Sequence, residues 1–100
     1  MTPDEMVAFL MERVGHEKLG ARGEVRRFIQ AEPLYQVSYL IGGRQILALH
    51  DEMVGPGKKS ERQFHDAVLK QGCMPIELLR AALKGIPLPK DAQPSWRFAG

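Results

Sequence analysis

Six side chains in this sequence could take part in chemistry: three histidines, one cysteine and two tyrosines. His16, His50 and His65 stand on separate segments, without the three- or four-residue spacing that places two metal ligands on one helix face. His16-Glu17 begins like the zinc motif His-Glu-x-x-His, but Gly20 occupies the position of the second histidine. A metal site would have to be assembled by folding from distant residues, and ordinary surface histidines are the simpler interpretation.

Cys73 lies just before the helix expected to begin at Pro75, a position where a helix amino terminus can activate a thiol as a nucleophile. A small residue in a turn is the simpler interpretation. Because it is the only cysteine, no internal disulfide can form, and the fold must depend on packing.

Tyr35 and Tyr39 are four residues apart, so they project from the same face of the helix expected to contain them. In a protein core, their hydroxyl groups would need hydrogen-bond partners. In a cleft, one phenol could instead donate a hydrogen bond to an oxyanion. Spacing alone favours the core interpretation.

Five helices are needed to position these residues, and apolar periodicity with start and stop signals predicts them. They run from Thr2 to Gly15, from Ala21 to Ala31, over 34–54, from Ser60 to Gly72 and from Pro75 to Gly85. Capping boxes, Thr2 with Glu5 and Ser60 with Gln63, mark two of the starts. The inward faces are expected to comprise Met6, Val7, Leu10, Met11 and Val14; Ala21, Val25, Phe28 and Ile29; Phe64, Ala67 and Val68; and Ile76, Leu79, Ala82 and Leu83.

The predicted fold is all-α, with about five helices packed around a central apolar helix over 34–54. Residues 1–85 would form the helical domain and residues 86–100 an extended, proline-containing tail that Trp96 and Phe98 pin back. The central helix is apolar on nearly all sides, which is typical of the middle of a bundle. Its Gly42-Gly43 pair costs about 1 kcal/mol per glycine, so we expect another backbone or a ligand to approach there.

Composition excludes several classes of function. The net charge of +2 is small and its charges are interspersed, which argues against nucleic acid as the main partner. The segment from Ser60 to Gly85 has helix-turn-helix proportions, but its second helix offers only Glu77 and Arg80, with Lys84 beyond, to read bases. The longest apolar run, Met6 to Met11, is too short to span a membrane, and no signal peptide is recognisable, so the compartment is unknown.

Nearly the whole sequence resembles the carboxy-terminal end of bacterial proteins in the domain-of-unknown-function family 885. The resemblance is carried, in order and with similar gaps, by MTPDEMVAFLMERVGHE, EVRRF, PLYQVSYLIGGRQILALHDEM, GKKSERQFHDAVLKQGCMPIELLRAAL and PSWRF. The most specific blocks are MERVGHE, SYLIG and RQFHDAVL. Those proteins are several times longer and resemble zinc-dependent peptidases of the thermolysin-like superfamily, with a His-Glu zinc helix upstream of this region.

A second similarity concerns the tyrosines. Helical peptidases of the angiotensin-converting and carboxypeptidase Taq types have a late helix with the pattern Tyr-x-x-(Ser/Thr)-aromatic, to which Tyr35-Gln36-Val37-Ser38-Tyr39 is similar. In the former, the first tyrosine stabilises the tetrahedral intermediate. The similarity implies that Tyr35 is the oxyanion donor and Tyr39 its support, or the donor itself if the match shifts by one turn.

The resemblance also implies what this chain does not contain. Zinc is expected in the full-length relatives, but this sequence has no zinc helix, and we expect no cofactor in this chain. We therefore expect a carboxy-terminal portion of a zinc-dependent peptidase that is inactive alone and binds the remainder of the enzyme. The exposed central helix would otherwise self-associate, giving a homo-oligomer. A standalone helical interaction module is the alternative, and a DNA-binding protein is a third, weaker one.

Overall fold

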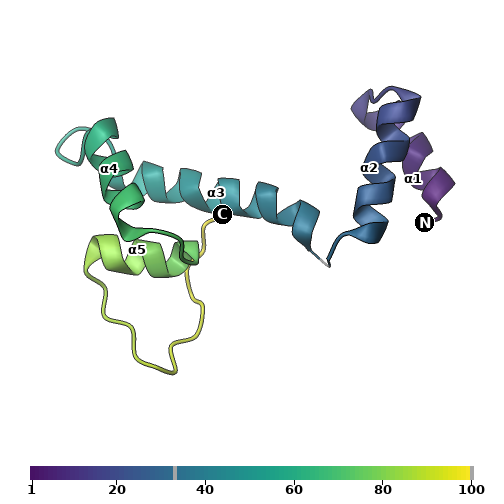
Figure 1. Ribbon diagram of the computed structural model, residues 1–100. Helices are drawn as coiled ribbons and strands as arrows, with labels where there is room; N and C mark the ends of the chain where they lie inside the picture. The colour runs from purple at the N-terminus through teal and green to yellow at the C-terminus, as the bar shows by residue number, and fades with distance from the viewer. Residues whose placement is uncertain (33, 100) are drawn as a thin grey trace. The chain divides into compact units, whose positions relative to one another are not determined.

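A computed structural model describes residues 1–32 and 34–99 of the chain (Figure 1). It confirms the all-α fold class: five α-helices follow one another, and the described residues contain no β-strand beyond an isolated bridge between Val54 and Lys59. The elements are α1 (Pro3–Phe9), the π-helical turn η1 (Leu10–Val14), α2 (Lys18–Gln30), α3 (Tyr35–Met53), α4 (Glu61–Gln71) and α5 (Ile76–Lys84). None of these helices combines the length and apolar character that a membrane span requires.

The helix ends follow the local signals in the sequence. Both capping boxes form. The hydroxyl groups of Thr2 and Ser60 accept hydrogen bonds from the backbone N–H three residues later, and the side chains of those later residues, Glu5 and Gln63, accept hydrogen bonds from the backbone N–H of Thr2 and Ser60. Gly15 and Gly85 end their helices in the left-handed conformation. The predicted break at Pro33 falls outside the described residues.

Three of the helices differ from the prediction at one end. The second helix begins three residues early, at Lys18, because the Glu17 side chain accepts a hydrogen bond from the Gly20 amide and caps it. The last turn of the first helix is the wider π-helical turn η1 rather than an α-helical turn. The Leu10 carbonyl oxygen there accepts a hydrogen bond from the His16 backbone N–H. Leu34 has a left-handed φ of 69°, so α3 starts at Tyr35.

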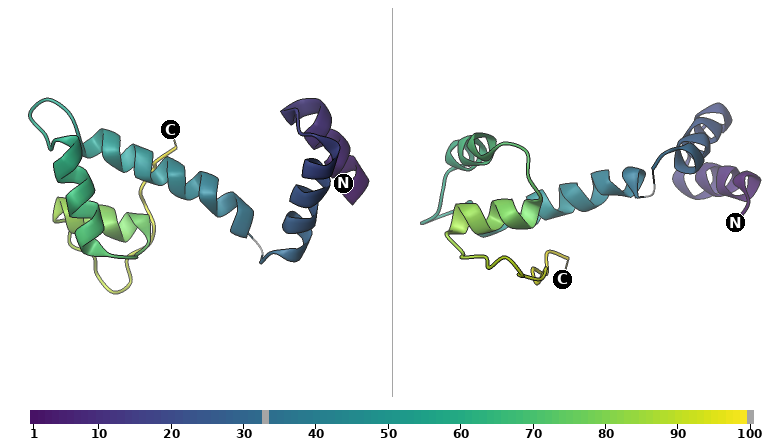
Figure 2. Two further views of the ribbon diagram at one scale, coloured as in Figure 1. Left: turned by 45° about the horizontal axis from the view of Figure 1, so that its top comes forward. Right: turned by 60° about the horizontal axis from the view of Figure 1, so that its bottom comes forward.

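The chain divides into two compact units, Met1–Tyr39 and Leu40–Gly100, and the division falls within α3. In the first unit, α1 packs beside α2 and only Ala21 and Val25 are buried (Figure 2). The predicted burial of Phe28 and Ile29 is wrong: these side chains are 46% and 57% exposed, because the described residues of the unit place no further helix over this end of α2.

The second unit has the larger core, where α3, α4 and α5 meet. The buried cluster comprises Leu49, Met53, Phe64 and Leu79, and the side chains packed against it are Ile46, Val54, Val68, Met74, Ile76, Leu83 and Trp96. On α5, Ala81 is buried and Ala82 is exposed, the reverse of the prediction. Burial in α3 is confined to its carboxy-terminal half, so its apolar amino-terminal half is exposed rather than enclosed by a bundle.

Candidate functional site

The two tyrosines form a pair at the amino-terminal end of α3. Their hydroxyl oxygens are 2.9 Å apart, and either hydroxyl can be the donor. The rings meet edge to face at 90°, with 5.6 Å between centroids, which is a favourable geometry for two aromatic rings. Tyr35 is 50% and Tyr39 67% exposed, so the core interpretation of the pair is wrong.

Local structure fixes where the pair stands. Tyr35 is the first residue of α3 and Tyr39 lies one turn later on the same face. Ser38 Oγ donates a 2.6 Å hydrogen bond to the Tyr35 carbonyl oxygen, which holds the first turn. Beside Tyr35 there is a shallow pocket of about 260 Å³. Its lining residues are Phe28, Ala31, Glu32, Leu34, Tyr35, Gln36 and Val37.

The hydrogen bond to Tyr35 raises the pKa of Tyr39, and the charge that Tyr35 would carry as a phenolate raises it further. The neutral form of Tyr39 is therefore favoured, and one of the two hydroxyl groups donates its proton to the other. Because the pair shares one hydrogen bond, the O–H of the accepting tyrosine is directed elsewhere and can donate to another acceptor.

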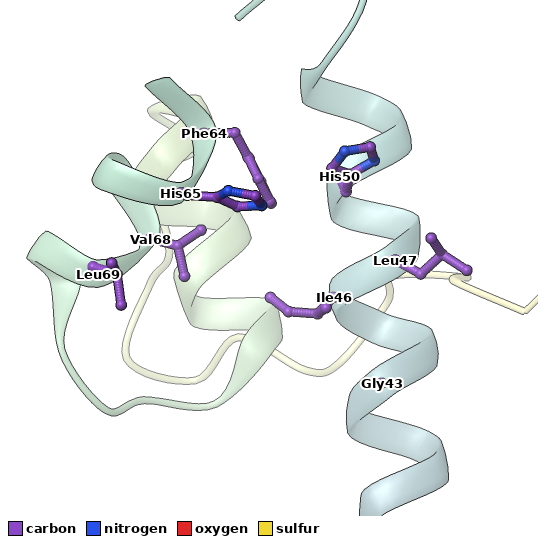
Figure 3. A pocket seen from close by; sticks show the side chains of 8 residues that line it. All are labelled: Gly43, Ile46, Leu47, His50, Phe64, His65, Val68 and Leu69. Atoms are coloured by element: carbon purple, nitrogen blue, oxygen red, sulfur yellow. The ribbon is translucent and has the colours of Figure 1, made fainter. Parts of the chain in front are cut away.

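A second candidate site is an apolar groove between α3 and α4 (Figure 3). Its volume is about 670 Å³, and its lining residues are Gly43, Ile46, Leu47 and His50 from α3 and Phe64, His65, Val68 and Leu69 from α4. Ile46 and Val68 face one another between the helices, while the Leu47 side chain projects on the side of α3 away from α4. Leu47 is 59% and Leu69 78% exposed.

His50 closes one end of this groove and joins α3 to α4. Its Nε2 lies 2.9 Å from both carboxylate oxygens of Glu61, its Nδ1 lies 3.3 Å from Asp51, and its ring meets the edge of Phe64. The hydrogen bond to Glu61 raises the pKa of His50, and that to Asp51 adds to the effect, which outweighs the opposing effect of desolvation. His50 therefore connects two segments, and its two carboxylate partners favour its protonated form.

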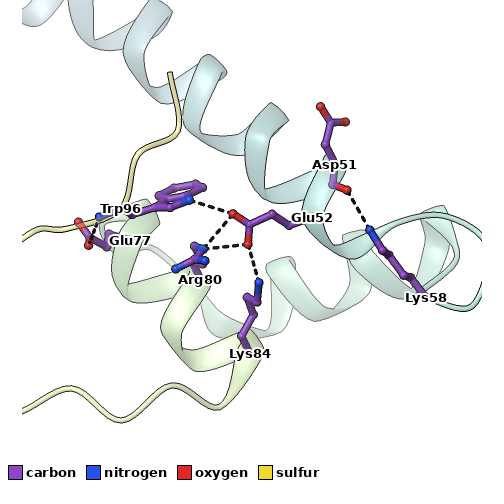
Figure 4. Close-up of polar contacts among 7 residues, drawn as sticks. All are labelled: Asp51, Glu52, Lys58, Glu77, Arg80, Lys84 and Trp96. Atoms are coloured by element: carbon purple, nitrogen blue, oxygen red, sulfur yellow. Dashed lines mark hydrogen bonds and ion pairs between the residues drawn. The ribbon is translucent and has the colours of Figure 1, made fainter. Parts of the chain in front are cut away.

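Glu52 is the centre of a third polar cluster (Figure 4). It accepts hydrogen bonds from Arg80 Nε at 2.9 Å, from Lys84 Nζ at 2.6 Å and from Trp96 Nε1 at 2.9 Å. Burial alone would raise the pKa of Glu52, but the hydrogen bonds from Lys84, Arg80 and Trp96 lower it overall. The Arg80 guanidinium also lies over the Trp96 ring, 5.1 Å from its centroid.

This cluster confirms that Trp96 pins the tail, with Phe98 beside it at 5.6 Å between ring centroids. It also bears on the DNA-binding alternative. A helix that reads bases needs basic side chains free to reach the groove, and the two basic residues of α5, Arg80 and Lys84, are bound to Glu52 instead.

The remaining sequence candidates do not assemble a metal centre. In the described part of the chain, no group of three or more His, Cys, Asp and Glu side chains could hold a metal ion. His16 is half-buried in the first unit, and Cys73 is exposed in the turn before α5. The zinc that the resemblance implies is therefore not matched by a ligand set among the described residues.

Sequence reasoning missed the polar partners that organise the second unit, Glu52 and Glu61. Both lie among exposed charged residues, where the sequence gives no sign of a partner 11 to 44 residues away. The free-energy cost of the Gly42-Gly43 pair predicted that another backbone or a ligand approaches there. Outside the helix's own backbone, the described residues place no atom within 4 Å of a Cβ built at Gly42 or Gly43. The close approach expected there is thus not made by these residues.

Comparison with known proteins places the chain in one family context. The model of a family described as "Bacterial protein of unknown function (DUF885)" matches residues 1–83. No curated protein and no solved structure matches the chain.

Proposed function

The chain belongs to the DUF885 family of bacterial proteins, and from this premise we propose that it is the carboxy-terminal helical portion of a peptidase, to which it contributes the Tyr35–Tyr39 pair. The observation that carries the proposal is the hydrogen bond between the two exposed hydroxyl groups, which leaves one phenol proton free. The similarity of Tyr35-Gln36-Val37-Ser38-Tyr39 to the tyrosine helix of helical peptidases supports the same assignment.

In peptide hydrolysis, the oxygen of water attacks the carbonyl carbon, and the electron pair of the C=O double bond moves to the oxygen. A neutral hydroxyl group placed at that oxygen stabilises the developing negative charge. Tyr35 would donate this hydrogen bond. Tyr39 would support it, because a phenol that accepts a hydrogen bond becomes a stronger donor.

The pair needs a nucleophile and a general base that the described residues do not bring beside it. A zinc ion, if the enzyme uses one, would be held by residues elsewhere in the complete enzyme. The chain alone should therefore not hydrolyse peptides, and its partner would be the remainder of that enzyme.

The first test is to sequence the gene upstream of the Met1 codon and to express the complete reading frame. In an active enzyme, Tyr35→Phe should lower kcat for peptide hydrolysis by roughly 10²- to 10³-fold and leave KM nearly unchanged. Ser38→Ala is the matched control, since it removes a hydroxyl group from the same turn whose hydrogen bond goes to the backbone. Wild-type kcat in both Tyr35→Phe and Tyr39→Phe would overturn the proposal.

A readout in the isolated chain does not depend on activity. Tyr35→Phe should bring the pKa of Tyr39 down toward its ordinary value, because the hydrogen bond and the neighbouring phenolate that raise it are both removed. Titration of tyrosinate absorbance measures this shift, and Ser38→Ala should leave it unchanged. An unshifted Tyr39 in the Tyr35→Phe variant would show that the pair does not exist in solution.

The alternative, a standalone helical interaction module, is favoured by a different observation, the apolar groove between α3 and α4. A stop codon in frame immediately before Met1 would favour this alternative over the peptidase.

A further inference from the structure

The tail after α5 is attached to the rest of the second unit by one short segment. Among its described residues, 86–99, only Trp96 and Phe98 are partly buried and all the others are exposed. Trp96 contacts a set of side chains on α3 and α5, Glu52, Glu77 and Arg80, which we name the tail site. We propose that the tail detaches reversibly, and that the tail site is a peptide-binding site that recognises an extended Pro-Ser-Trp segment.

Glu77 of α5 recognises the backbone of the segment. Its Oε1 accepts one hydrogen bond from the backbone N–H of Ser95 at 3.0 Å and a second from that of Trp96 at 3.1 Å, the latter drawn in Figure 4. Hydrogen bonds to a charged carboxylate are stronger than those between neutral groups. Pro94 stands directly before the two donors and restricts the backbone there, because its ring fixes φ. Glu77 therefore selects one backbone conformation.

Glu52 of α3 and Arg80 of α5 recognise the indole ring. The Trp96 Nε1–H donates a 2.9 Å hydrogen bond to Glu52, and the Arg80 guanidinium lies over the ring, 5.1 Å from its centroid. The ring also packs against the buried cluster of the second unit. A phenylalanine in this place would keep the apolar contacts but could not donate to the carboxylate. The tail site therefore prefers tryptophan.

The tail site keeps its shape without the tail, because its supports lie in the helices. Arg80 Nε and Lys84 Nζ, both on α5, hold the Glu52 carboxylate at 2.9 and 2.6 Å. The backbone N–H of Ile86 bonds to the Ala81 carbonyl oxygen and closes α5 before the tail begins. The buried cluster is made by side chains of α3, α4 and α5. The tail can thus leave while the helices stay packed, and the preorganised site can take the same segment from a separate peptide.

The tether between α5 and the seated segment determines how well a separate peptide competes. Residues 86–94 are exposed, and the two hydrogen bonds at Ala92 and Gln93 are made within the tail itself. A short flexible tether gives its bound end an effective concentration on the order of millimolar. A separate peptide must overcome this concentration in the unchanged chain, but not in a chain whose own tail lacks the indole.

Fluorescence anisotropy of a fluorescein-labelled peptide tests the proposal on the full-length chain. The peptide has the sequence of residues 93–98, Gln-Pro-Ser-Trp-Arg-Phe. It should bind the Trp96→Ala chain with a Kd below about 1 mM, and the unchanged chain at least about 10-fold more weakly. In the Trp96→Ala chain, a further Glu77→Ala change should raise the Kd at least about 10-fold, whereas Asp66→Ala on α4 is the matched control and should leave it within about 3-fold. The same peptide with phenylalanine in place of its tryptophan should also bind at least about 10-fold more weakly.

Two further measurements show whether the tail leaves on its own. The Trp96→Ala chain should keep the helical circular dichroism of the unchanged chain, and loss of that signal would overturn the proposal, because the tail would then be part of the core. In the unchanged chain, the backbone amides of Ser95 and Trp96 should be at least about 10-fold less protected from hydrogen exchange than the amide of Leu49, which is fully buried.

Three other results would also overturn the proposal: equal protection of these amides, no binding of the peptide to the Trp96→Ala chain, or equal affinity for that chain and the unchanged one. These measurements are independent of the tyrosine pair, since Tyr35 and Tyr39 belong to the first unit and the tail site to the second.

Discussion

At the scale of single residues, His50 shows how a few contacts change the chemistry of a side chain that is partly open to solvent. Its imidazole is held between the carboxylates of Glu61 and Asp51, and the charged form is favoured by both. The same contacts tie the end of α3 to the first turn of α4. Protonation of His50 and association of these two segments are therefore linked.

The linkage predicts a direction for stability against pH. A raised folded-state pKa means that the stabilisation by His50 is complete below its unfolded pKa of about 6.5 and is lost as pH rises through the higher folded value. Glu61→Gln should lower the pKa of His50 and weaken this dependence. Nuclear magnetic resonance titration of the imidazole protons measures the pKa, and His16, in the other unit, serves as the internal control.

The prediction fails if Glu61→Gln leaves the His50 titration where it is in the unchanged chain. Such a result would mean that the contact between the Nε2 atom and the carboxylate is absent in solution.

At the scale of elements, Glu52 connects α3, α5 and the tail through one carboxylate. Arg80 and Lys84 come from α5, and Trp96 comes from the tail. The carboxylate is about three-quarters buried, with 27% of its side chain exposed, so its bonds are more shielded from water than those of a surface ion pair. The tail is positioned by this group together with the apolar contacts of Trp96.

Glu52→Gln should lower the free energy of unfolding by about 1–3 kcal/mol, because it removes the charge that three donors share. Urea unfolding followed by the fluorescence of Trp96, the only tryptophan, measures the loss. Since the pKa of Glu52 is lowered, its contribution is present above its unfolded pKa of about 4.5 and is lost as pH falls through the lower folded value. The difference between Glu52→Gln and the unchanged chain should therefore shrink in acid.

Asp66→Asn is the matched control for this change. Asp66 is an exposed carboxylate whose contact with Arg62 is long, at 3.9 Å, so its loss should cost less than about 1 kcal/mol. Equal effects of the two substitutions would contradict a special role for Glu52.

The elements themselves were predictable from sequence because their signals are local. Thr2 and Ser60 specify helix starts through bonds to residues three positions away, and Gly15 and Gly85 specify ends by their own backbone. The burial of Phe28 and Ile29 was mispredicted, because an apolar stripe does not say whether another element covers it. For the same reason the spacing of Tyr35 and Tyr39 predicted one shared face but not its exposure.

At the scale of the whole molecule, the two compact units have very different cores. The first buries only Ala21 and Val25, whereas the second buries a cluster of four large side chains that includes Leu49. Burial of apolar surface is the main source of stability, so the second unit should open less often than the first.

Leu49→Ala should destabilise the second unit by about 2–5 kcal/mol, since Leu49 is fully buried and its loss leaves a cavity. Hydrogen exchange should then accelerate in α4 and α5 and stay unchanged in α2, which belongs to the unit with the smaller core. Leu47→Ala, two residues earlier and 59% exposed, is the control and should leave exchange in α4 and α5 close to that of the unchanged chain. Equal acceleration in α2 and α5 would show that the two units unfold together.

The bond from Trp96 to Glu52 joins residues 44 positions apart, whereas capping boxes and helical turns join residues three or four apart. Closing a long loop costs more chain entropy than forming a turn, and contacts distant in sequence tend to form late. The docking of the tail is therefore expected to be the last step in the folding of the second unit. Until it occurs, the Glu52 carboxylate would hold the two cations of α5 without its indole partner.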